Sequence, residues 1–185
     1  VELQNGDVFI AHNYNDSNYY LYGIVVKISG ATITAGTDTQ LSTRTLSGQY
    51  ISATLLQDGR VFIAHSYDSY SYLYGMICTI NDTAITVDTD TRLSSTKYTG
   101  LRASACTLPN GNVSIAHSSG TSSTFYLYGI VCSIWGTTIT AGTDTALVTT
   151  NNNGTLMSSV ALDNGNVFIA HSNSGKLHAI VCSVS

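Results

Sequence analysis

The chain has 185 residues, of which 43% are hydrophobic and only 10% are charged, and its formal net charge is −4. This length and composition suit one folded domain with a substantial core and exclude a disordered chain. The seven Lys and Arg residues are scattered, and no apolar run approaches the roughly 20 residues of a membrane helix. We therefore expect neither a nucleic-acid partner nor membrane insertion.

A tandem repeat of about 52 residues extends over almost the whole chain. Its clearest marker is the motif Val-Phe-Ile-Ala-His, which occurs four times, with Ser in place of Phe in the third copy. The copies end at His12, His65, His117 and His171, which are steps of 53, 52 and 54 residues. Such a period predicts a repeat architecture. It divides the single domain 1–185 into repeats at about 1–48, 49–100, 101–154 and 155–185.

Each repeat contains four strand-like runs, in an order that the second copy shows most clearly. The run ISATL at 51–55 precedes an Asp-Gly dipeptide, which favours a tight hairpin turn because both turn residues can adopt positive φ. The run VFIAH at 61–65 follows, and then YLYGMICTI at 72–80. After a short turn comes TAITVDTDT at 83–91. No segment shows a sustained helical period.

Four antiparallel strands in each repeat predict an all-β fold, and their repetition favours a β-propeller with one blade per repeat. A β-solenoid would usually have shorter coils, and a β-sandwich would not need identical repeats. Residues 1–7 are expected to form a truncated first strand, and the last repeat stops after its third strand. We therefore expect fifteen strands, with the sixteenth absent.

The incomplete first and last blades leave two alternatives for the ring. It is either four-bladed with a short last blade or part of a larger ring, which a longer chain or a second chain would complete. Unpaired edge strands are ready templates for pairing with another chain. We therefore expect a homo-oligomer that associates through these two blades.

The repeated histidines can be interpreted in two ways. Four imidazoles near the propeller axis would suit a metal ion. A residue that recurs in every blade, however, usually supports the blade, and an aspartate recurs in the fourth run of three repeats. We therefore expect buried histidines that donate to a carboxylate or a backbone carbonyl, with no metal and no cofactor. This structural set comprises His12, His65, His117, His171, Asp38, Asp90 and Asp144.

The cysteines and carboxylates give no sign of catalysis. Cys78, Cys132 and Cys182 occupy one repeat position, where the first copy has Val26, so they are expected to be free apolar packing residues, as is Cys106. Glutamate occurs once, at Glu2, and no nucleophile elbow or phosphate-binding loop is present. The sequence therefore predicts a protein that is not an enzyme.

The repeats differ most in the loops that join the second strand to the third and the fourth to the next repeat. These loops are rich in Tyr, Ser, Asn, Gly and Thr, which is typical of binding loops because Tyr offers rigid contact area. Tyr rings also stack on sugars. The predicted ligand-binding residues are Tyr14, Tyr19, Tyr50, Tyr67, Tyr70 and Tyr98.

The strings NGNVFIAHS, YLYGIVCSI and GTTITAGTDT together resemble the tandem repeats of tail-fibre-type proteins from phages and prophages of Gram-positive bacteria. The resemblance covers essentially the whole chain, and "KLHAIVCSV" at 176–184 departs most from it. It implies a receptor-facing or structural module on a virion or tail-like particle, made in a bacterial cytoplasm. Because the chain begins inside a repeat, we expect a fragment or a trimmed chain, and its localisation stays open.

We predict a non-enzymatic, lectin-like module that recognises a glycan or another cell-surface receptor through one loop-rich face. The first alternative is a structural or assembly repeat of a tail-like fibre with no ligand of its own. The second is a propeller hydrolase, which would need two converging carboxylates.

Overall fold

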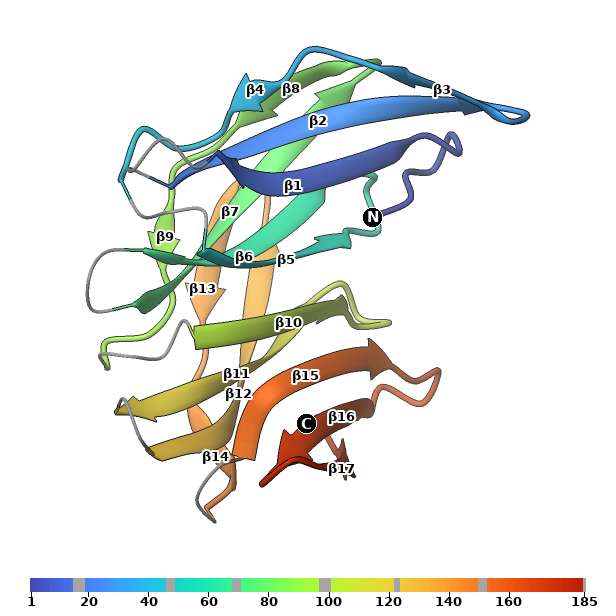
Figure 1. Cartoon of the computed structure of the whole chain (residues 1–185). Helices are drawn as coiled ribbons and strands as arrows, with labels where there is room; N and C mark the ends of the chain where they lie inside the picture. The colour runs from blue at the N-terminus through green and yellow to red at the C-terminus, as the bar shows by residue number, and fades with distance from the viewer. Residues whose placement is uncertain are drawn as a thin grey trace.

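The structure is a computed structural model that describes residues 1–14, 19–45, 49–67, 71–96, 101–121, 124–149 and 153–184 (Figure 1). All regular elements in these ranges are β-strands, which confirms the predicted all-β class. Among the same residues, no helix is long and apolar enough to cross a membrane.

The strands form four antiparallel sheets that follow one another in chain order. The first sheet contains β1 (Val8–Tyr14), β2 (Tyr20–Ser29), β3 (Thr32–Ala35) and β4 (Thr39–Gln40). The second contains β5 (Gln49–Leu55), β6 (Val61–Tyr67), β7 (Tyr72–Asn81), β8 (Ala84–Val87) and β9 (Thr91–Arg92). The third contains β10 (Leu101–Thr107), β11 (Val113–Thr121), β12 (Thr124–Trp135), β13 (Thr138–Ala141) and β14 (Thr145–Val148). The fourth contains β15 (Asn153–Ala161), β16 (Val167–Asn173) and β17 (Lys176–Cys182).

The fourth run of each complete repeat is broken into two short strands, which the sequence did not predict. In the first sheet β3 pairs with the C-terminal part of β2, from Val26 to Ser29, and β4 pairs with Tyr22 and Gly23 nearer its start. The break between β3 and β4 falls at 36–38. The Gly36 amide still donates to the Val25 carbonyl at 2.9 Å. A Cβ at Gly36 would lie 2.9 Å from that oxygen, so the backbone approaches closely here, although Asp88 occupies the equivalent position in the second sheet. The break turns Asp38 out of the ladder and toward the second strand.

Residues 1–7 form a single bridge, Glu2 to Val8, in place of a strand. The Val1 and Phe9 backbones exchange two hydrogen bonds of 2.7 and 2.9 Å, and a turn then reverses the chain between Leu3 and Asp7. The inner strand that was expected at 1–7 is therefore reduced to the pairing of Val1 and Glu2 with β1.

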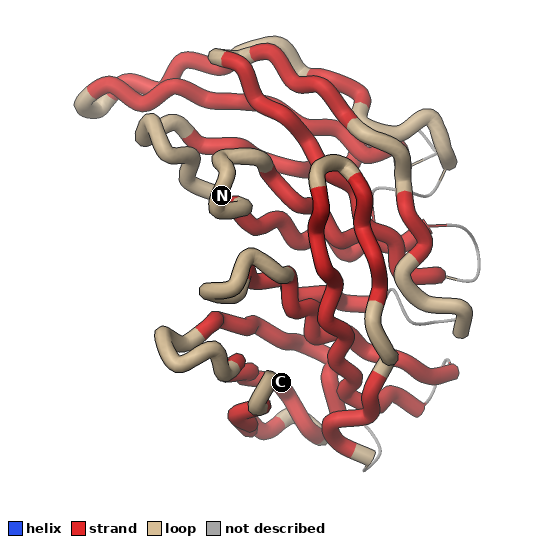
Figure 2. Tube along the Cα trace, turned by 180° about the vertical axis from the view of Figure 1, so that it is seen from behind, coloured by secondary structure: helices blue, strands red, loops and turns tan. Residues whose placement is uncertain are grey.

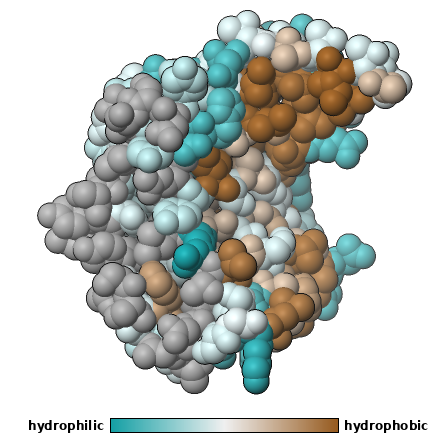
Figure 3. Space-filling model, in the orientation of Figure 1, coloured by the Kyte–Doolittle hydropathy of each residue, from teal (hydrophilic) through white to brown (hydrophobic). Residues whose placement is uncertain are grey.

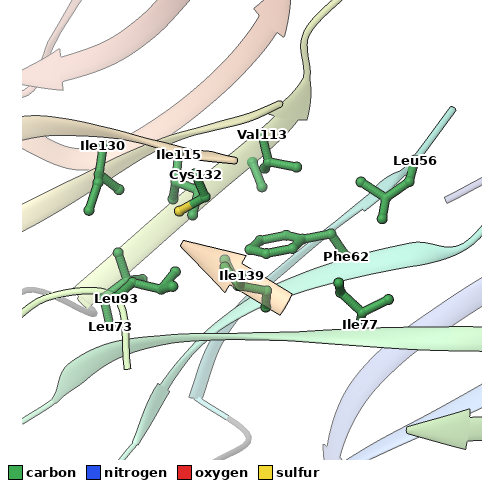
Figure 4. Close-up of a cluster of buried hydrophobic side chains, with 12 residues drawn as sticks. Leu56, Phe62, Leu73, Ile77, Leu93, Val113, Ile115, Ile130, Cys132 and Ile139 are labelled. Atoms are coloured by element: carbon green, nitrogen blue, oxygen red, sulfur yellow. The ribbon is translucent and has the colours of Figure 1, made fainter. Parts of the chain in front are cut away.

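Consecutive sheets pack face to face, and their side chains form three apolar clusters. Each sheet has a rear face, toward the preceding sheet, and a forward face, toward the following one. Between the second and third sheets, the fully buried Phe62 of the forward face lies among Val113, Cys132 and Ile139 of the next rear face (Figure 4). A Cβ at Gly75 would lie 2.8 Å from the Phe62 ring, so this glycine makes room for the phenyl group.

The third interface departs from this pattern because Ser114 stands where the other repeats have Phe9, Phe62 and Phe168. Between the third and fourth sheets Leu108 and Leu127 still pack against Val167 and Ile169. Beside Ser114 and Gly129 a cavity of about 350 Å³ remains. The space lies where the phenyl ring is missing and where the fourth sheet has no described counterpart of β13.

The four sheets form an open arc, with the first and last sheets at its two ends (Figures 1 and 2). The inner strands β5, β10 and β15 lie next to one another along this arc. Apolar side chains remain exposed over both end sheets (Figure 3). They include Ile10 and Ile33 at one end and Val160, Phe168 and Val181 at the other.

Candidate functional site

The repeated histidine and aspartate meet in each of the first three sheets. His12 Nε2 lies 2.9 Å from Asp38 Oδ1, and the corresponding distance is 2.8 Å for His65 with Asp90 and for His117 with Asp144. The histidine lies on the second strand and the aspartate at the break in the fourth run, so the pair spans the third strand between them.

The aspartate also links neighbouring sheets. Ser42 Oγ, which follows β4, donates to Asp90 Oδ2 of the second sheet at 3.2 Å. Ser94 Oγ donates to Asp144 Oδ2 of the third sheet at the same distance. A buried carboxylate with several hydrogen bonds is a specific connection. The geometry therefore supports a role in holding sheets together.

The four histidines differ in burial, although the sequence led us to expect all of them to be mostly buried. The side chains of His65 and His117 are fully buried, whereas that of His12 is 34% exposed because no sheet packs on the rear face of the first sheet. His171 is buried, but no aspartate lies opposite its Nε2 among the described residues. The expected pattern is thus complete only in the second and third sheets.

The structure offers no support for a shared histidine metal site. Each of the first three imidazoles stacks on a Tyr of its own sheet, at ring distances of 6.0 to 6.1 Å. Within the described ranges, no three His, Cys, Asp or Glu side chains are close enough to hold a metal ion.

All four cysteines are free thiols. Burial raises the pKa of Cys78 and of Cys132 to about 12. It also raises the pKa of Cys106 and of Cys182, whose side chain is the least buried of the four. Thiolate, the reactive form, is therefore scarce at Cys78 and Cys132 at neutral pH.

We expect Cys182 to react first with a thiol reagent such as Ellman's reagent at pH 8, and Cys78 and Cys132 to react only upon unfolding. Mass spectrometry of the modified protein at successive times would give the order. The unfolded thiols ionise near pH 8.5, so the free energy of unfolding should also fall as the pH rises from about 9 toward 12. Rapid modification of Cys78 in the folded protein would contradict the prediction.

Among the described tyrosines of the predicted set, Tyr14, Tyr19 and Tyr67 flank the connection between the second and third strands, and Tyr50 lies at the start of β5, after the connection from the first repeat. Tyr14 and Tyr50 are 56% and 42% exposed, and Tyr19 and Tyr67 are half-buried. Both Tyr19 and Tyr50 have a φ of 51°, which is uncommon for a residue with a side chain. Tyr70 and Tyr98 fall outside the described residues.

Three arginines join these aromatic rings, and the sequence analysis missed them. The Arg44 guanidinium carbon lies 5.0 Å from the centre of the Tyr67 ring, and Tyr67 meets Tyr74 edge to face at 5.3 Å. Arg92 lies 3.7 Å above the Tyr72 ring. Only seven Lys and Arg residues occur in the chain, and these three lie in or beside the segments that join one repeat to the next, which was a signal available in the sequence.

Two of the arginines are held in place. Arg92 donates through Nε and Nη2 to the carbonyl oxygens of Ser94 and Ser95, each at 2.8 Å. Arg102 has a φ of 55°, and its guanidinium lies 5.5 Å from the Phe125 ring. Its Nη1 is buried without a hydrogen-bond partner among the described residues. We name Tyr14, Tyr50, Tyr67, Tyr72, Arg44, Arg92 and Arg102 the aromatic–arginine surface.

Comparison with known proteins gives structural matches alone. No protein-family model matches the sequence, and no curated protein matches it significantly. The NanB sialidase of Streptococcus pneumoniae, in complex with 2-[(3-chlorobenzyl)ammonio]ethanesulfonate, superposes on the entire chain with a TM-score of 0.69 at 13% identity. A point mutant of that sialidase has the same TM-score and identity over 99% of the chain, and NanB with optactamide has a TM-score of 0.68, also at 13% identity.

The all-β fold of the chain is similar to part of the β-propeller of these sialidases. The chain spans 30% of the length of each of these sialidase chains. At 13% identity the likeness concerns the fold, which agrees with the class that the repeats predict.

Proposed function

We propose that the protein binds a glycan through the aromatic–arginine surface. The observation that carries this proposal is the pairing of guanidinium groups with tyrosine rings at the same end of neighbouring sheets. A tyrosine combines a large apolar ring with a hydroxyl group, which suits the apolar face and the hydroxyl groups of a sugar. The sialidase-like fold supports a carbohydrate as the class of ligand.

The arginines favour a sugar that carries a carboxylate. A guanidinium group donates two parallel hydrogen bonds to a carboxylate and keeps its charge at all physiological pH values. Arg44 and Arg92 are exposed, and no described carboxylate forms an ion pair with Arg92 or Arg102. The tyrosine ring beneath the guanidinium of Arg44 and of Arg92 limits the motion of that group, which reduces the entropic cost of binding.

We propose binding without hydrolysis. Asp38, Asp90 and Asp144, the aspartates that recur in the fourth run, each accept a hydrogen bond from a histidine. Glu2, the only glutamate, lies beside the turn at the opposite end of the first sheet. Neither arrangement supplies the two converging carboxyl groups that glycoside hydrolysis ordinarily uses.

A structural role in a larger assembly is the second candidate function, in line with the resemblance to tail-fibre-type repeats. It is favoured by the apolar side chains that stay exposed at both ends of the arc, of which Leu177 is 84% and Ile33 69% exposed. Apolar patches of this kind often mark contacts with other protein.

We expect the protein to bind one or more acidic glycans on a glycan array, and Tyr67→Ala to weaken that binding at least tenfold in calorimetry. The ring that Arg44 covers would be lost, and with it the sugar contact. Trp135→Ala is the matched control: this aromatic side chain is 88% exposed at the opposite end of the third sheet. Equal affinity of wild type and Tyr67→Ala, an equal loss in Trp135→Ala, or release of sugar from a fluorogenic sialoside would contradict the proposal.

A further inference from the structure

The last strand of the chain has one free edge among the described residues. In the first three sheets the third strand pairs with the second strand on one side and with the two short strands of the fourth run on the other. β17 pairs only with β16 within the part of the chain that the structure describes. An open strand edge of this kind can accept an added strand.

A cavity lies where the side chain of such a strand would be buried. Between the second and third sheets, Ile139 of β13 is 7% exposed and packs beside the Phe62 ring (Figure 4). The equivalent space between the third and fourth sheets is the 350 Å³ cavity, lined by Ser114 and Ile130 on one side and by Val167, Ile169 and Cys182 on the other. This space is large enough for an isoleucine side chain.

A buried histidine lies at the other end of the same edge. His171 is 4% exposed, and its Nδ1 is 3.4 Å from the Ser172 carbonyl oxygen. In the other sheets the aspartate that contacts the histidine Nε2 stands five residues after the isoleucine of the fourth run. In the third sheet these residues are Asp144 and Ile139. No aspartate takes this place in the fourth sheet among the described residues.

We propose that the free edge of β17 binds an extended polypeptide of the type Thr-Ile-Thr-x-x-Thr-Asp-Thr. The strand runs antiparallel to β17, with its isoleucine in the cavity opposite Val184 and its aspartate bonded to His171 Nε2. This register repeats that of β12, where Ile134 lies opposite Ile139. The proposal rests on the fold and is independent of glycan binding.

The occupant comes from polypeptide outside the four repeats. The three segments of the required type in this chain are already paired within their own sheets, through β3, β8 and β13. A second copy of the chain would have to release one of them and expose its own cores. One contact differs from the other sheets: Val148 replaces the serine that donates to the aspartate as Ser42 and Ser94 do. His171 is thus the main polar partner of the incoming aspartate.

The test is a titration of the chain with a fluorescein-labelled peptide that has the sequence of residues 136–149, followed by fluorescence anisotropy. We expect saturable binding at a ratio of one to one. Asp144→Asn or Ile139→Thr in the peptide should weaken it at least tenfold. In the protein, His171→Gln should weaken binding of the unchanged peptide by a similar factor. His12→Gln is the matched control and should leave it unchanged, because Asp38 already occupies that site.

Amide hydrogen exchange locates the peptide independently of affinity. The carbonyl groups of Leu21 and Val25 accept hydrogen bonds from the fourth run of the first sheet, and Leu177 and Val181 are their equivalents on β17. The peptide should slow exchange at Leu177 and Val181 and leave His178 and Ile180, which face β16, unchanged. Absence of saturable binding, equal affinity for the Asp144→Asn peptide, or a β17 edge already protected in a dimer of the chain would overturn the proposal.

Discussion

Replacement of Phe62 by alanine is expected to lower the free energy of unfolding by about 3–5 kcal/mol. The Phe62 ring is completely buried and lies at the centre of the cluster that joins the second and third sheets. The ring packs closely over Gly75 beside Leu93, so its loss would leave a cavity that the neighbouring strands cannot readily fill. Unfolding by urea, followed by circular dichroism, would measure the effect.

The repeat provides a matched control for this substitution. Phe168 occupies the same position in the fourth sheet. No described sheet packs on the forward face of the fourth sheet, and Phe168 is 37% exposed. Phe168→Ala should therefore cost less than half as much as Phe62→Ala, because part of the ring is hydrated in the folded protein and no closed cavity forms. Equal losses at the two positions would show that the packing between sheets does not determine stability.

Replacement of His65 by alanine is expected to lower the free energy of unfolding by about 3–5 kcal/mol, as is usual when one partner of a buried polar pair is removed. The side chains of His65 and Asp90 are 0% and 8% exposed, and their atoms are 2.8 Å apart. Without the imidazole, Asp90 would keep the hydroxyl of Ser42 as its side-chain partner and would stay buried. The cost therefore includes the desolvation of a carboxylate.

His12→Ala tests whether burial is the cause. His12 and Asp38 make the same contact at 2.9 Å with side chains that are 34% and 42% exposed. Water can replace the lost partner there, so the expected cost is about 1 kcal/mol or less. Double-mutant cycles on the two pairs should give a larger coupling energy for His65 and Asp90. Similar coupling energies for the two pairs would contradict burial as the cause of the larger effect at His65.

The two proposals concern different parts of the molecule, so that one can fail while the other stands. The aromatic–arginine surface lies at the connections between the second and third strands and at those between one repeat and the next. The free edge of β17 and the cavity lie within the fourth sheet and at its contact with the third. Tyr67→Ala should not change peptide binding, and His171→Gln should not change glycan binding.

Several features of the fold followed from the sequence because they are local. The Asn-Gly and Asp-Gly turns, the strand-like runs without a helical period and the repeated motifs predicted the all-β class and the hairpins. The expected partnership of histidine with aspartate depended on two residues that recur together in three repeats, 25 to 27 residues apart. The broken fourth run was missed, because a continuous Thr-rich pattern does not reveal where a side chain must leave the ladder.

The aromatic–arginine surface was predicted only in part. Tyrosines were recognised because they are numerous in the variable loops, whereas arginines were dismissed as scattered. They are scattered in the sequence, but Arg44 follows the last strand of one sheet and Tyr67 ends the second strand of the next. Their contact exists because consecutive sheets pack face to face, which no local pattern in either segment records.

The sequence by itself determined the period, the strand class and the residue types that recur in each sheet. Only the tertiary structure decided how deeply each copy of a recurring residue is buried. Phe62 and Phe168, or His65 and His12, are equivalent in sequence and differ in burial, because burial depends on whether another sheet covers that face. Local propensities act along one chain segment, whereas the desolvation of a side chain is set by neighbours that are far away in the sequence.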